Sequence, residues 1–487
     1  MNDLASIVSC GIYVPSLRLE RAHIAQALQW LGPPAGGPIS GTRAVCNWDE
    51  DPLTMAVEAG RRCLAEDAAA ECVPAALDLA STTLPFADRS NATLVASALD
   101  LSESTRARDS CGSLRAGTTA LAEAAARHET AATLIIASDA RLAQPGSAQE
   151  LQFGAGAAAL LVTSDPQRAG PAPRATIRAA AHLSADFVDH YRMGAERFDY
   201  TFEERWVRDE GFMKLVTVAI ARALAAAQTE AEAVQYLVMP GPAVTVKRVA
   251  QASGLANVRV QDSLREDCGD AGTAHPLLLL AGVLETATCG ERILLVGFGQ
   301  GVDALVLVAA QGAGKPARLP IAQALGRRKL EQYYTRYLAH NGLLEPYFGM
   351  RAERDNRTAQ SVAWRKHRQT TAFVGGRCAA CGTVQFPKAR VCVNPDCRRA
   401  DTQVDHRLAG TTGRVKSFTE DWQAYSPRPP YIYGNVDLES GGNLLMEFTD
   451  VEPGELQVDD RVKFVFRVKD IDRLRSYKRY FWKATKI

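Results

Sequence analysis

The chain has 487 residues, of which 47% are hydrophobic and 23% charged, with a formal net charge of +1. This length favours two to four domains, and a near-zero net charge gives no overall electrostatic argument for binding nucleic acid or a membrane. The N-terminal residues contain no basic segment followed by an apolar one. The longest apolar runs are far shorter than the roughly 20 residues that cross a bilayer, so we expect a cytoplasmic protein.

Short apolar runs alternate with alanine-rich stretches up to about residue 312. Buried strands are predicted at 76–82, 132–140, 158–165, 235–241, 292–299 and 304–311. Helices, with apolar residues three and four apart, are predicted at 55–70, 119–129 and 215–228. Such alternation is typical of an α/β architecture.

Two sequence matches indicate an internal duplication. FGAGAAALLV at 153–162 matches FGQGVDALVLV at 298–308, and CGSLRAGTTA at 111–120 matches CGDAGTAHP at 268–276. Because the matches occur in the same order at similar offsets, we predict two related halves, residues 1–168 and 169–312.

The composition changes after residue 312. Residues 313–370 are polar and helical in pattern, and we expect a linker that packs on the first domain. A cysteine-rich segment follows at 371–405, and 406–487 contains short β-branched and aromatic runs separated by Gly, Pro and Asp. This last pattern is typical of a small antiparallel β-barrel.

Four of the eleven cysteines are clustered, with the spacing C-x2-C-x10-C-x4-C. They are Cys378, Cys381, Cys392 and Cys397. Four thiolates complete a tetrahedral, closed zinc site, so we predict structural Zn²⁺ in a zinc ribbon. The basic, aromatic stretch 461–487 could hold single-stranded nucleic acid or coenzyme A, but a solvated barrel edge with a basic tail is our leading interpretation.

Residues 1–312 resemble the HMG-CoA synthase branch of the thiolase-like superfamily, which includes ketoacyl-ACP synthase III. The resemblance rests on GIYVPSLRLERAHIAQAL at 11–28, GDAGTAHPLLLLAGVLE at 269–285 and GERILLVGFGQGVDA at 290–304. The last 115 or so residues resemble the rubredoxin-like zinc-ribbon/OB-fold proteins that accompany thiolase-like enzymes. The resemblance implies a duplicated five-layer αβαβα core, a homodimer, and acyl-CoA as substrate. It argues against nucleic acid as a partner, and we expect no membrane partner.

The resemblance also locates the family's catalytic positions, and none carries the expected group. In the family, the nucleophilic cysteine lies four residues before the threonine of a Gly-Thr pair; here that position is Leu114. The glutamate position is Thr82, and the histidine falls at Met239 or Pro240. The polar residue of the family's Gly-Asn turn becomes Asp270. The chain is therefore not expected to be an HMG-CoA synthase.

We predict an acyl-CoA enzyme that forms or cleaves a C–C bond by aldol-type chemistry, which needs a base and an oxyanion hole but no acyl-enzyme. Two alternatives stay open: an acyltransferase that uses Cys111, and a non-catalytic CoA-binding scaffold for a partner chain. For Cys111 itself we favour a buried structural role over a nucleophilic one, because its repeat counterpart Cys268 occupies the matching turn. Candidate catalytic residues are Asp270, His275, Cys111, Tyr200, Glu204 and His190. Candidate substrate-binding residues are Leu114, Thr82, Arg115, Arg208, Gly299 and Gly301.

Overall fold

The computed structural model describes residues 3–32, 39–66, 72–127, 131–194, 196–201, 203–353 and 359–487. The chain forms two compact units. The first comprises Met1–Asn47, Asp51–Ala96 and Leu101–Tyr337, and the second comprises Trp48–Glu50, Ser97–Asp100 and Leu338–Ile487. Within the described ranges, no helix is long and apolar enough to span a membrane. The finer boundaries at 168, 312, 370 and 405 stay predictions.

A ten-stranded sheet organises the first unit, in the order β12-β11-β13-β14-β8-β1-β7-β6-β4-β5. The first half contributes β1 (Ala5–Tyr13), β4 (Pro74–Ala80), β5 (Arg106–Ser110), β6 (Ala132–Ala140) and β7 (Ala155–Thr163). The second half contributes β8 (Ala175–Ser184), β11 (Tyr236–Val238), β12 (Arg259–Val260), β13 (Arg292–Phe298) and β14 (Gly301–Ala309). Both halves use the same strand order and the same parallel and antiparallel pairings, which confirms the predicted duplication.

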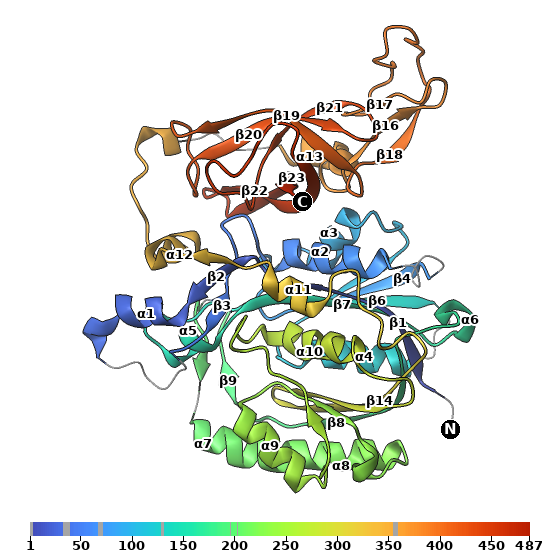
Figure 1. The fold of residues 1–487 in the computed structure, drawn as a ribbon, viewed down its shortest axis with the longest axis vertical. Helices are drawn as coiled ribbons and strands as arrows, with labels where there is room; N and C mark the ends of the chain where they lie inside the picture. The colour runs from blue at the N-terminus through green and yellow to red at the C-terminus, as the bar shows by residue number, and fades with distance from the viewer. Residues whose placement is uncertain are drawn as a thin grey trace. The chain divides into compact units, whose positions relative to one another are not determined.

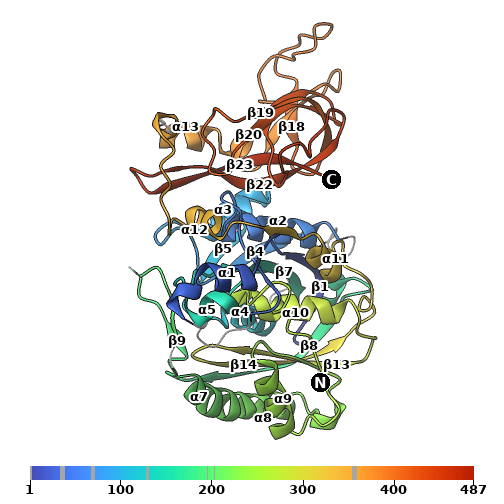
Figure 2. The ribbon, with the colours of Figure 1, turned by 60° about the vertical axis from the view of Figure 1, so that its left-hand side comes forward.

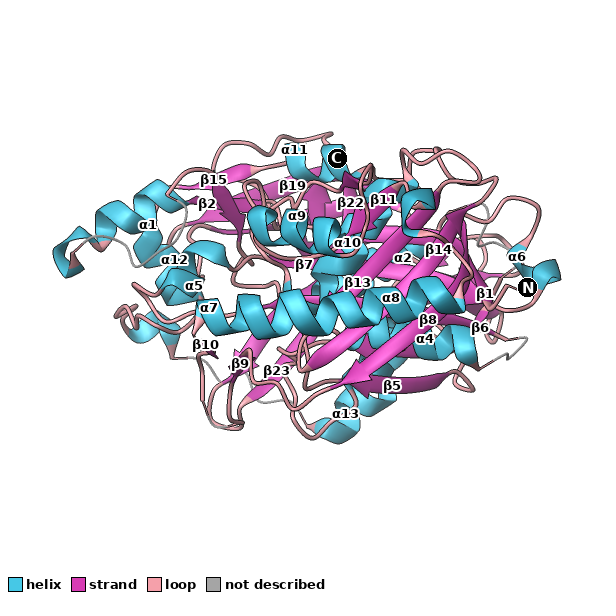
Figure 3. Cartoon of the chain, turned by 90° about the horizontal axis from the view of Figure 1, so that it is seen from below, coloured by secondary structure: helices cyan, strands magenta, loops and turns pink. Residues whose placement is uncertain are grey.

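Helices separate and cover the two halves of this sheet (Figure 1 and Figure 2). The helices α4 (Ala116–Ala126) and α10 (His275–Leu284) lie between the halves. Every residue of α10 is buried, as expected for HPLLLLAGVL, which is apolar on all sides after its first residue. The helix α2 (Pro52–Leu64) covers the first half (Figure 1), and α8 (Thr217–Ala226) and α9 (Ala243–Ala252) cover the second (Figure 3). The result is the layered α/β core that the sequence predicts.

The predicted strands and helices of this core are present, although the helix ends at 67–70 and 128–129 lie outside the described residues. One expectation needs correction: the linker is not purely helical. Its β15 (Lys329–Glu331) pairs in parallel with β2 (Leu17–Glu20), because backbone pairing at a sheet edge needs no apolar run. Other helices and strands are β3 (Thr42–Ala44), α1 (Arg21–Ala27), α3 (Asn91–Ala98), α5 (Ala148–Gln152), α6 (Pro166–Ala169), α11 (Ile321–Gly326), α12 (Tyr334–His340), α13 (Gln360–Arg365) and α14 (His367–Thr370).

The second unit contains a three-stranded ribbon and a five-stranded antiparallel barrel. The ribbon is formed by β16 (Val374–Cys378), β17 (Val384–Gln385) and β18 (Gln403–Arg407). The barrel strands are β19 (Thr412–Asp421), β20 (Tyr431–Leu438), β21 (Asn443–Glu447), β22 (Arg461–Asp472) and β23 (Tyr477–Lys486). The C-terminal stretch forms β22 and β23, so the expectation of a basic tail is wrong. Its Phe464, Phe466 and Trp482 are fully buried, and the aromatic residues that alternate with the charges form the barrel core.

Candidate functional site

The turn before α4 meets the glycine-rich turn of the second half. The Ser113 hydroxyl donates to the Gly299 carbonyl at 2.7 Å, and the Arg115 Nε donates to the same oxygen at 3.1 Å. A side chain at Gly299 would place its Cβ 3.2 Å from the Leu114 Cβ, which is closer than ordinary packing allows. Leu114 thus stands at the contact between the two turns, half-buried. The site combines residues that are about 185 positions apart in sequence.

Cys111 is exposed at the end of β5, so the expectation that it is a buried structural thiol is wrong. It follows β5, which is an edge strand of the ten-stranded sheet as described. Its counterpart Cys268 is buried in the core. Partial desolvation, and then the charges of Asp109 and Asp139, raise the pKa of the Cys111 thiol. Because only a thiolate is nucleophilic, these surroundings oppose a nucleophilic role.

A buried carboxylate, Asp139, connects the first-half turn that contains Thr82 to the second half. Its two oxygens accept six hydrogen bonds from the backbone N–H groups of Thr82 and Thr273 and from the hydroxyls of Ser81, Thr82, Thr83 and Thr273, at 2.7–3.1 Å. Thr82 therefore presents a hydroxyl already committed to Asp139, at the position where the resemblance places the family's glutamate.

Asp270 lies on the second-half turn, beside the first half. Its carboxylate accepts the Gly272 N–H at 3.0 Å and pairs with Arg265. Burial by itself would raise the pKa of Asp270, but Arg265, with smaller contributions from His275 and Arg141, holds it well below its usual range. A carboxylate held in this way is a weak general base, because it resists protonation.

The His275 ring is fully buried, and both of its nitrogens are engaged. Its Nδ1 accepts the Ala271 N–H at 3.2 Å, and its Nε2 donates to the Ser263 carbonyl at 2.9 Å. Burial lowers the pKa of the ring, against the raising effect of Asp270. The geometry therefore supports a neutral ring that shapes the turn more than one that exchanges protons with a substrate.

A short hairpin carries the third group of candidate residues. It is formed by β9 (His190–Tyr191) and β10 (Tyr200–Thr201), and we call it the flap. Tyr200 is 57% exposed, and its ring centroid lies 5.4 Å from that of Tyr191.

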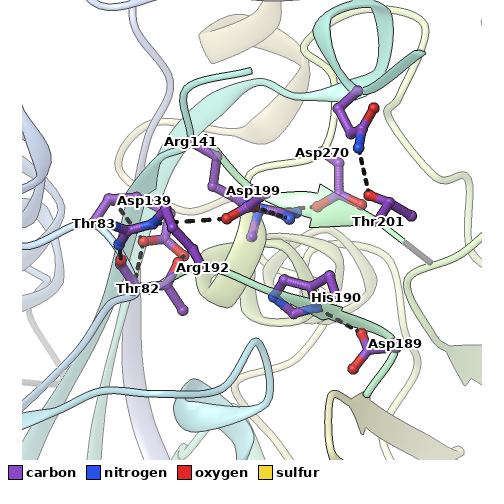
Figure 4. A network of polar contacts seen from close by, with 12 residues as sticks. Thr82, Thr83, Asp139, Arg141, Asp189, His190, Arg192, Asp199, Thr201 and Asp270 are labelled. Atoms are coloured by element: carbon purple, nitrogen blue, oxygen red, sulfur yellow. Dashed lines mark hydrogen bonds and ion pairs between the residues drawn. The ribbon is translucent and has the colours of Figure 1, made fainter. Parts of the chain in front are cut away.

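The flap is fastened to the first half by three contacts (Figure 4). Asp199 lies between two guanidinium groups and accepts two hydrogen bonds from Arg141 at 3.0 and 2.5 Å. The other two contacts run from Arg192 to the Thr82 carbonyl at 2.8 Å and from Gln149 to the Thr201 hydroxyl at 2.7 Å.

Asp189 and His190 form a nearly buried pair at the base of the flap. The His190 Nδ1 lies 2.8 Å from the Asp189 Oδ2, and their side chains are 12% and 9% exposed. Since a carboxylate only accepts, the proton of this bond sits on Nδ1, and the lone pair of a neutral ring is on Nε2. Among the residues described, none hydrogen-bonds this Nε2. His190 thus has the arrangement of an oriented general base.

The other candidate residues take different places. Glu204 is exposed at the start of α7 (Glu204–Trp206), and Arg208 pairs with Asp209 on the surface of the following π-helix. Arg115 points inward to the buried Asp303, at 2.8 Å. Gly301 begins β14 with a φ of 123°, in the region that favours glycine. Among the described residues, no hydrogen bond or ion pair joins Glu204 or Arg208 to the Asp189–His190 pair.

The four clustered cysteines of the ribbon converge. Their sulfur atoms all lie within 4.8 Å of one another, with Cys378–Cys397 at 3.9 Å and Cys381–Cys392 at 3.6 Å. Tetrahedral Zn²⁺ with Zn–S distances of about 2.3 Å requires S–S separations of about 3.8 Å. The donor set and its geometry therefore fit structural zinc.

Comparisons with known proteins agree with both parts of this description. Residues 365–403 match the family model "ChsH2, rubredoxin-like zinc ribbon domain", and residues 406–467 match "ChsH2, C-terminal OB-fold domain". A hydroxymethylglutaryl-CoA synthase of Aeropyrum pernix is 27% identical over 350 residues, which are 70% of this chain and 95% of that protein. The chain therefore has an N-terminal region similar to HMG-CoA synthases, followed by ChsH2-type zinc ribbon and OB-fold domains.

Other relatives match the same two parts of the chain. A DUF35 domain-containing scaffold protein of Methanothermobacter thermautotrophicus is 30% identical over 107 residues, which are 21% of this chain and 78% of that protein. Among solved structures, MvaS in complex with 3-hydroxy-3-methylglutaryl coenzyme A has a TM-score of 0.57 at 19% identity, covering 71% of this chain and 93% of that one. PksG, a HMG-CoA synthase from Bacillus subtilis, also has a TM-score of 0.57 at 19% identity, covering 72% and 95%. At these identities the structures show the fold alone.

Sequence reasoning missed two features of the candidate site. The first is the hydrogen-bonding role of Asp139, although three consecutive hydroxyl residues at 81–83 could have suggested a buried acceptor. The second is Gln300, whose backbone and side chain both contact the Asp189–His190 pair. A glutamine between two glycines carries no signal of its own.

Proposed function

We propose that this protein is an acyl-CoA enzyme that forms or cleaves a C–C bond by aldol-type chemistry without an acyl-enzyme. The observation that carries the proposal is Leu114, an aliphatic side chain at the first-half turn, packed against Gly299 where the resemblance places the thiol. The only cysteine in this turn, Cys111, is three residues earlier and has a raised pKa.

The same turn supports enolate chemistry. The backbone N–H of Leu114, two residues before the start of α4, has no hydrogen-bond acceptor among the residues described. A backbone N–H near a helix N-terminus stabilises a developing oxyanion, such as that of a thioester enolate. This contribution needs no thiol, so it survives the replacement of cysteine by leucine.

His190, oriented by Asp189, is the proposed acid/base. In the cleavage direction, its Nε2 takes the proton of the β-hydroxyl, the Cα–Cβ bond breaks, and the bonding electrons form the thioester enolate. The new carbonyl compound leaves, and the imidazolium returns its proton to the α-carbon, which yields a shortened acyl-CoA. The reverse sequence joins the two fragments. Atoms and charges balance with no further reactant.

Several parts of the proposal rest on relatives. HMG-CoA synthases among the relatives, and a neighbour in complex with an acyl-CoA, support a CoA thioester as substrate. We also propose that the protein is a homodimer and that its OB-fold barrel contributes to CoA binding, as the resemblance implies. Zinc has only a structural role in this scheme, because the four cysteines leave no coordination position open.

A scaffold function is the second candidate. Two relatives of the C-terminal region carry the name "DUF35 domain-containing scaffold protein", and a scaffold would bind acyl-CoA without turnover. The acyltransferase that uses Cys111 stays a third candidate, and it predicts an acyl adduct on the protein.

Exchange of the α-hydrogens of acetyl-CoA with D2O would test enolate chemistry without knowledge of the full substrate. We expect deuterium incorporation by the wild-type protein, no acyl adduct in its intact mass, and loss of exchange in His190→Gln. The matched control is His340→Gln, which changes a histidine of α12 outside the candidate site. A wild-type adduct that disappears in Cys111→Ser would refute the proposal in favour of the acyltransferase. Binding of acetyl-CoA with neither exchange nor cleavage of 3-hydroxyacyl-CoAs would favour the scaffold.

A further inference from the structure

Gln300 occupies the turn between β13 and β14 in an unusual backbone conformation. Its φ is 47°, in the left-handed region that side-chain-bearing residues rarely adopt, and the residues on either side are Gly299 and Gly301. A glycine would adopt this conformation without strain. Strained backbone at a non-glycine residue points to a function for the side chain.

Both polar ends of Gln300 contact the Asp189–His190 pair. Its backbone N–H lies 3.3 Å from the Asp189 Oδ1, and its side-chain Nε2 donates to the His190 carbonyl at 3.0 Å. The backbone contact leaves the other carboxylate oxygen, Oδ2, to the His190 ring. One residue therefore limits rotation of the carboxylate and also fixes the backbone that carries the imidazole.

The same turn is fixed on its other side to the N-terminal end of α4. The Gly299 carbonyl accepts the hydrogen bonds of Ser113 and Arg115, and Gly299 packs against Leu114. Gln300 is the next residue along the chain. The three-residue turn 299–301 therefore sets the placement of the Asp189–His190 pair relative to Leu114.

Aromatic packing holds the remaining side of this arrangement. Phe187, two residues before Asp189, stacks on Trp206 at a centroid distance of 4.1 Å, and it lies 6.1 Å from Phe298. Phe298 directly precedes the 299–301 turn. Aromatic contacts thus anchor the segment before Asp189 and the residue before the 299–301 turn. The hydrogen bonds of Gln300 then limit how far the Asp189 and His190 side chains can rotate.

From these contacts we infer that Gln300 is a positioning residue for His190, and that it keeps the ring in the Nδ1–H tautomer with Nε2 available to substrate. The inference rests on the proposed function for its catalytic meaning, but the orientation and tautomer of the ring can be measured without any substrate. A neutral imidazole free of such constraints prefers the other tautomer, so loss of the constraint has a visible consequence.

The test uses the full chain with ¹⁵N-labelled histidine, in which the His190 signals are assigned by their absence in His190→Gln. In the wild-type protein, we expect a protonated Nδ1 and an unprotonated Nε2. In Gln300→Asn, the amide is one methylene too short to reach the His190 carbonyl, while asparagine tolerates the left-handed backbone. We expect its His190 signals to shift towards the Nε2–H tautomer. The rate of acetyl-CoA exchange at saturation should fall about 10- to 100-fold, with little change in KM.

Gln228→Asn is the matched control. Gln228 has the same φ of 47° but is exposed, in the loop that follows α8. This variant should leave the His190 signals and the exchange rate unchanged. Gln300→Glu is a second variant, in which the side chain keeps its length but an acceptor replaces the amide donor. This variant should also shift the tautomer of His190.

The outcomes separate the two proposals. Unchanged His190 signals and an unchanged rate in both folded Gln300 variants would overturn the positioning role. A tautomer shift in these variants, in a protein whose wild-type form neither exchanges acetyl-CoA nor cleaves 3-hydroxyacyl-CoAs, would support the positioning role and refute only the proposed function.

Discussion

Replacement of Asp139 by asparagine is the most direct test of how the candidate site is held together. The carboxylate accepts six hydrogen bonds, two of which come from the backbone N–H groups of Thr82 and Thr273, one on each oxygen. Hydroxyl donors can rotate and accept from an amide, but backbone N–H groups cannot. Whichever way the new amide is oriented, its NH2 group therefore faces one backbone donor that has lost its acceptor.

The cost follows from the number and type of these bonds. A buried N–H without an acceptor costs about 1–3 kcal/mol, and each bond that changes from a charged to a neutral acceptor loses about 1 kcal/mol. Three bonds remain on the amide oxygen in either orientation. With about 2 kcal/mol for the unpaired N–H, the sum for Asp139→Asn is about 5 kcal/mol. For a unit of this size 1 kcal/mol lowers Tm by about 2 °C, so we expect the thermal transition of the first unit to fall by about 10 °C.

Calorimetry of the full chain measures this change, with Asp165→Asn as the control. Asp165 accepts one N–H, from Gln167, at the start of α6, and asparagine caps a helix about as well as aspartate. Its partly exposed ion pair with Arg168, at 3.6 Å, contributes little to stability. The control should melt within about 1 °C of the wild type. If Asp139→Asn also melted within about 1 °C of the wild type, the carboxylate would not accept the six hydrogen bonds described. Another interaction would then have to hold the turns that contain Thr82 and Thr273 together.

Three further predictions concern the metal, the thiol and the buried imidazole. The wild-type protein should contain one zinc ion per chain by elemental analysis; Cys392→Ser should lose it and destabilise the second unit, whereas Cys289→Ser should retain it. Alkylation of Cys111 by iodoacetamide, followed by peptide mass spectrometry, should be slow at pH 7 and accelerate as pH rises above 9, because the thiol pKa is raised; fast labelling at pH 7 would contradict the described environment. Burial lowers the pKa of His275 in the folded state, so the unfolded state binds more protons below about pH 6.5. The free energy of unfolding of the wild type should therefore decrease between pH 7 and pH 5, by up to about 1.4 kcal/mol per pH unit. Denaturant titrations should show a smaller pH dependence in His275→Gln.

The sequence predicts the architecture well because the strands of the first unit are buried on both faces. Runs such as TLIIAS at 133–138 and RILLVG at 292–297 then read as continuous apolar segments, and the duplicated glycine turns mark equivalent places in each half. The four clustered cysteines are equally easy to predict as zinc ligands, since the signal for a zinc ribbon is their spacing along the chain.

The candidate site was predicted less completely, because its contacts join distant residues. The pattern could place His190 in a charged segment but could not show that Asp189 holds the ring or that Gln300 holds them both. The pattern also could not show that the His275 nitrogens are both used within their own turn. Burial of Cys111 was expected from its repeat counterpart, but repeats preserve backbone geometry more than side-chain surroundings.

The exchange of hydrogen bonds between the two halves has a consequence for folding. The second half's Thr273 donates to the first half's Asp139 at 2.9 Å, and the first half's Thr118 donates to the second half's Asp303 at 3.1 Å. Each half thus depends on the other to satisfy a buried carboxylate, across 134 and 185 residues of chain. Because these bonds form only when both halves are present, we expect the two halves to fold as one cooperative unit after both have been synthesised. Although the fold is built from two copies of one pattern, it is not built from two independent domains.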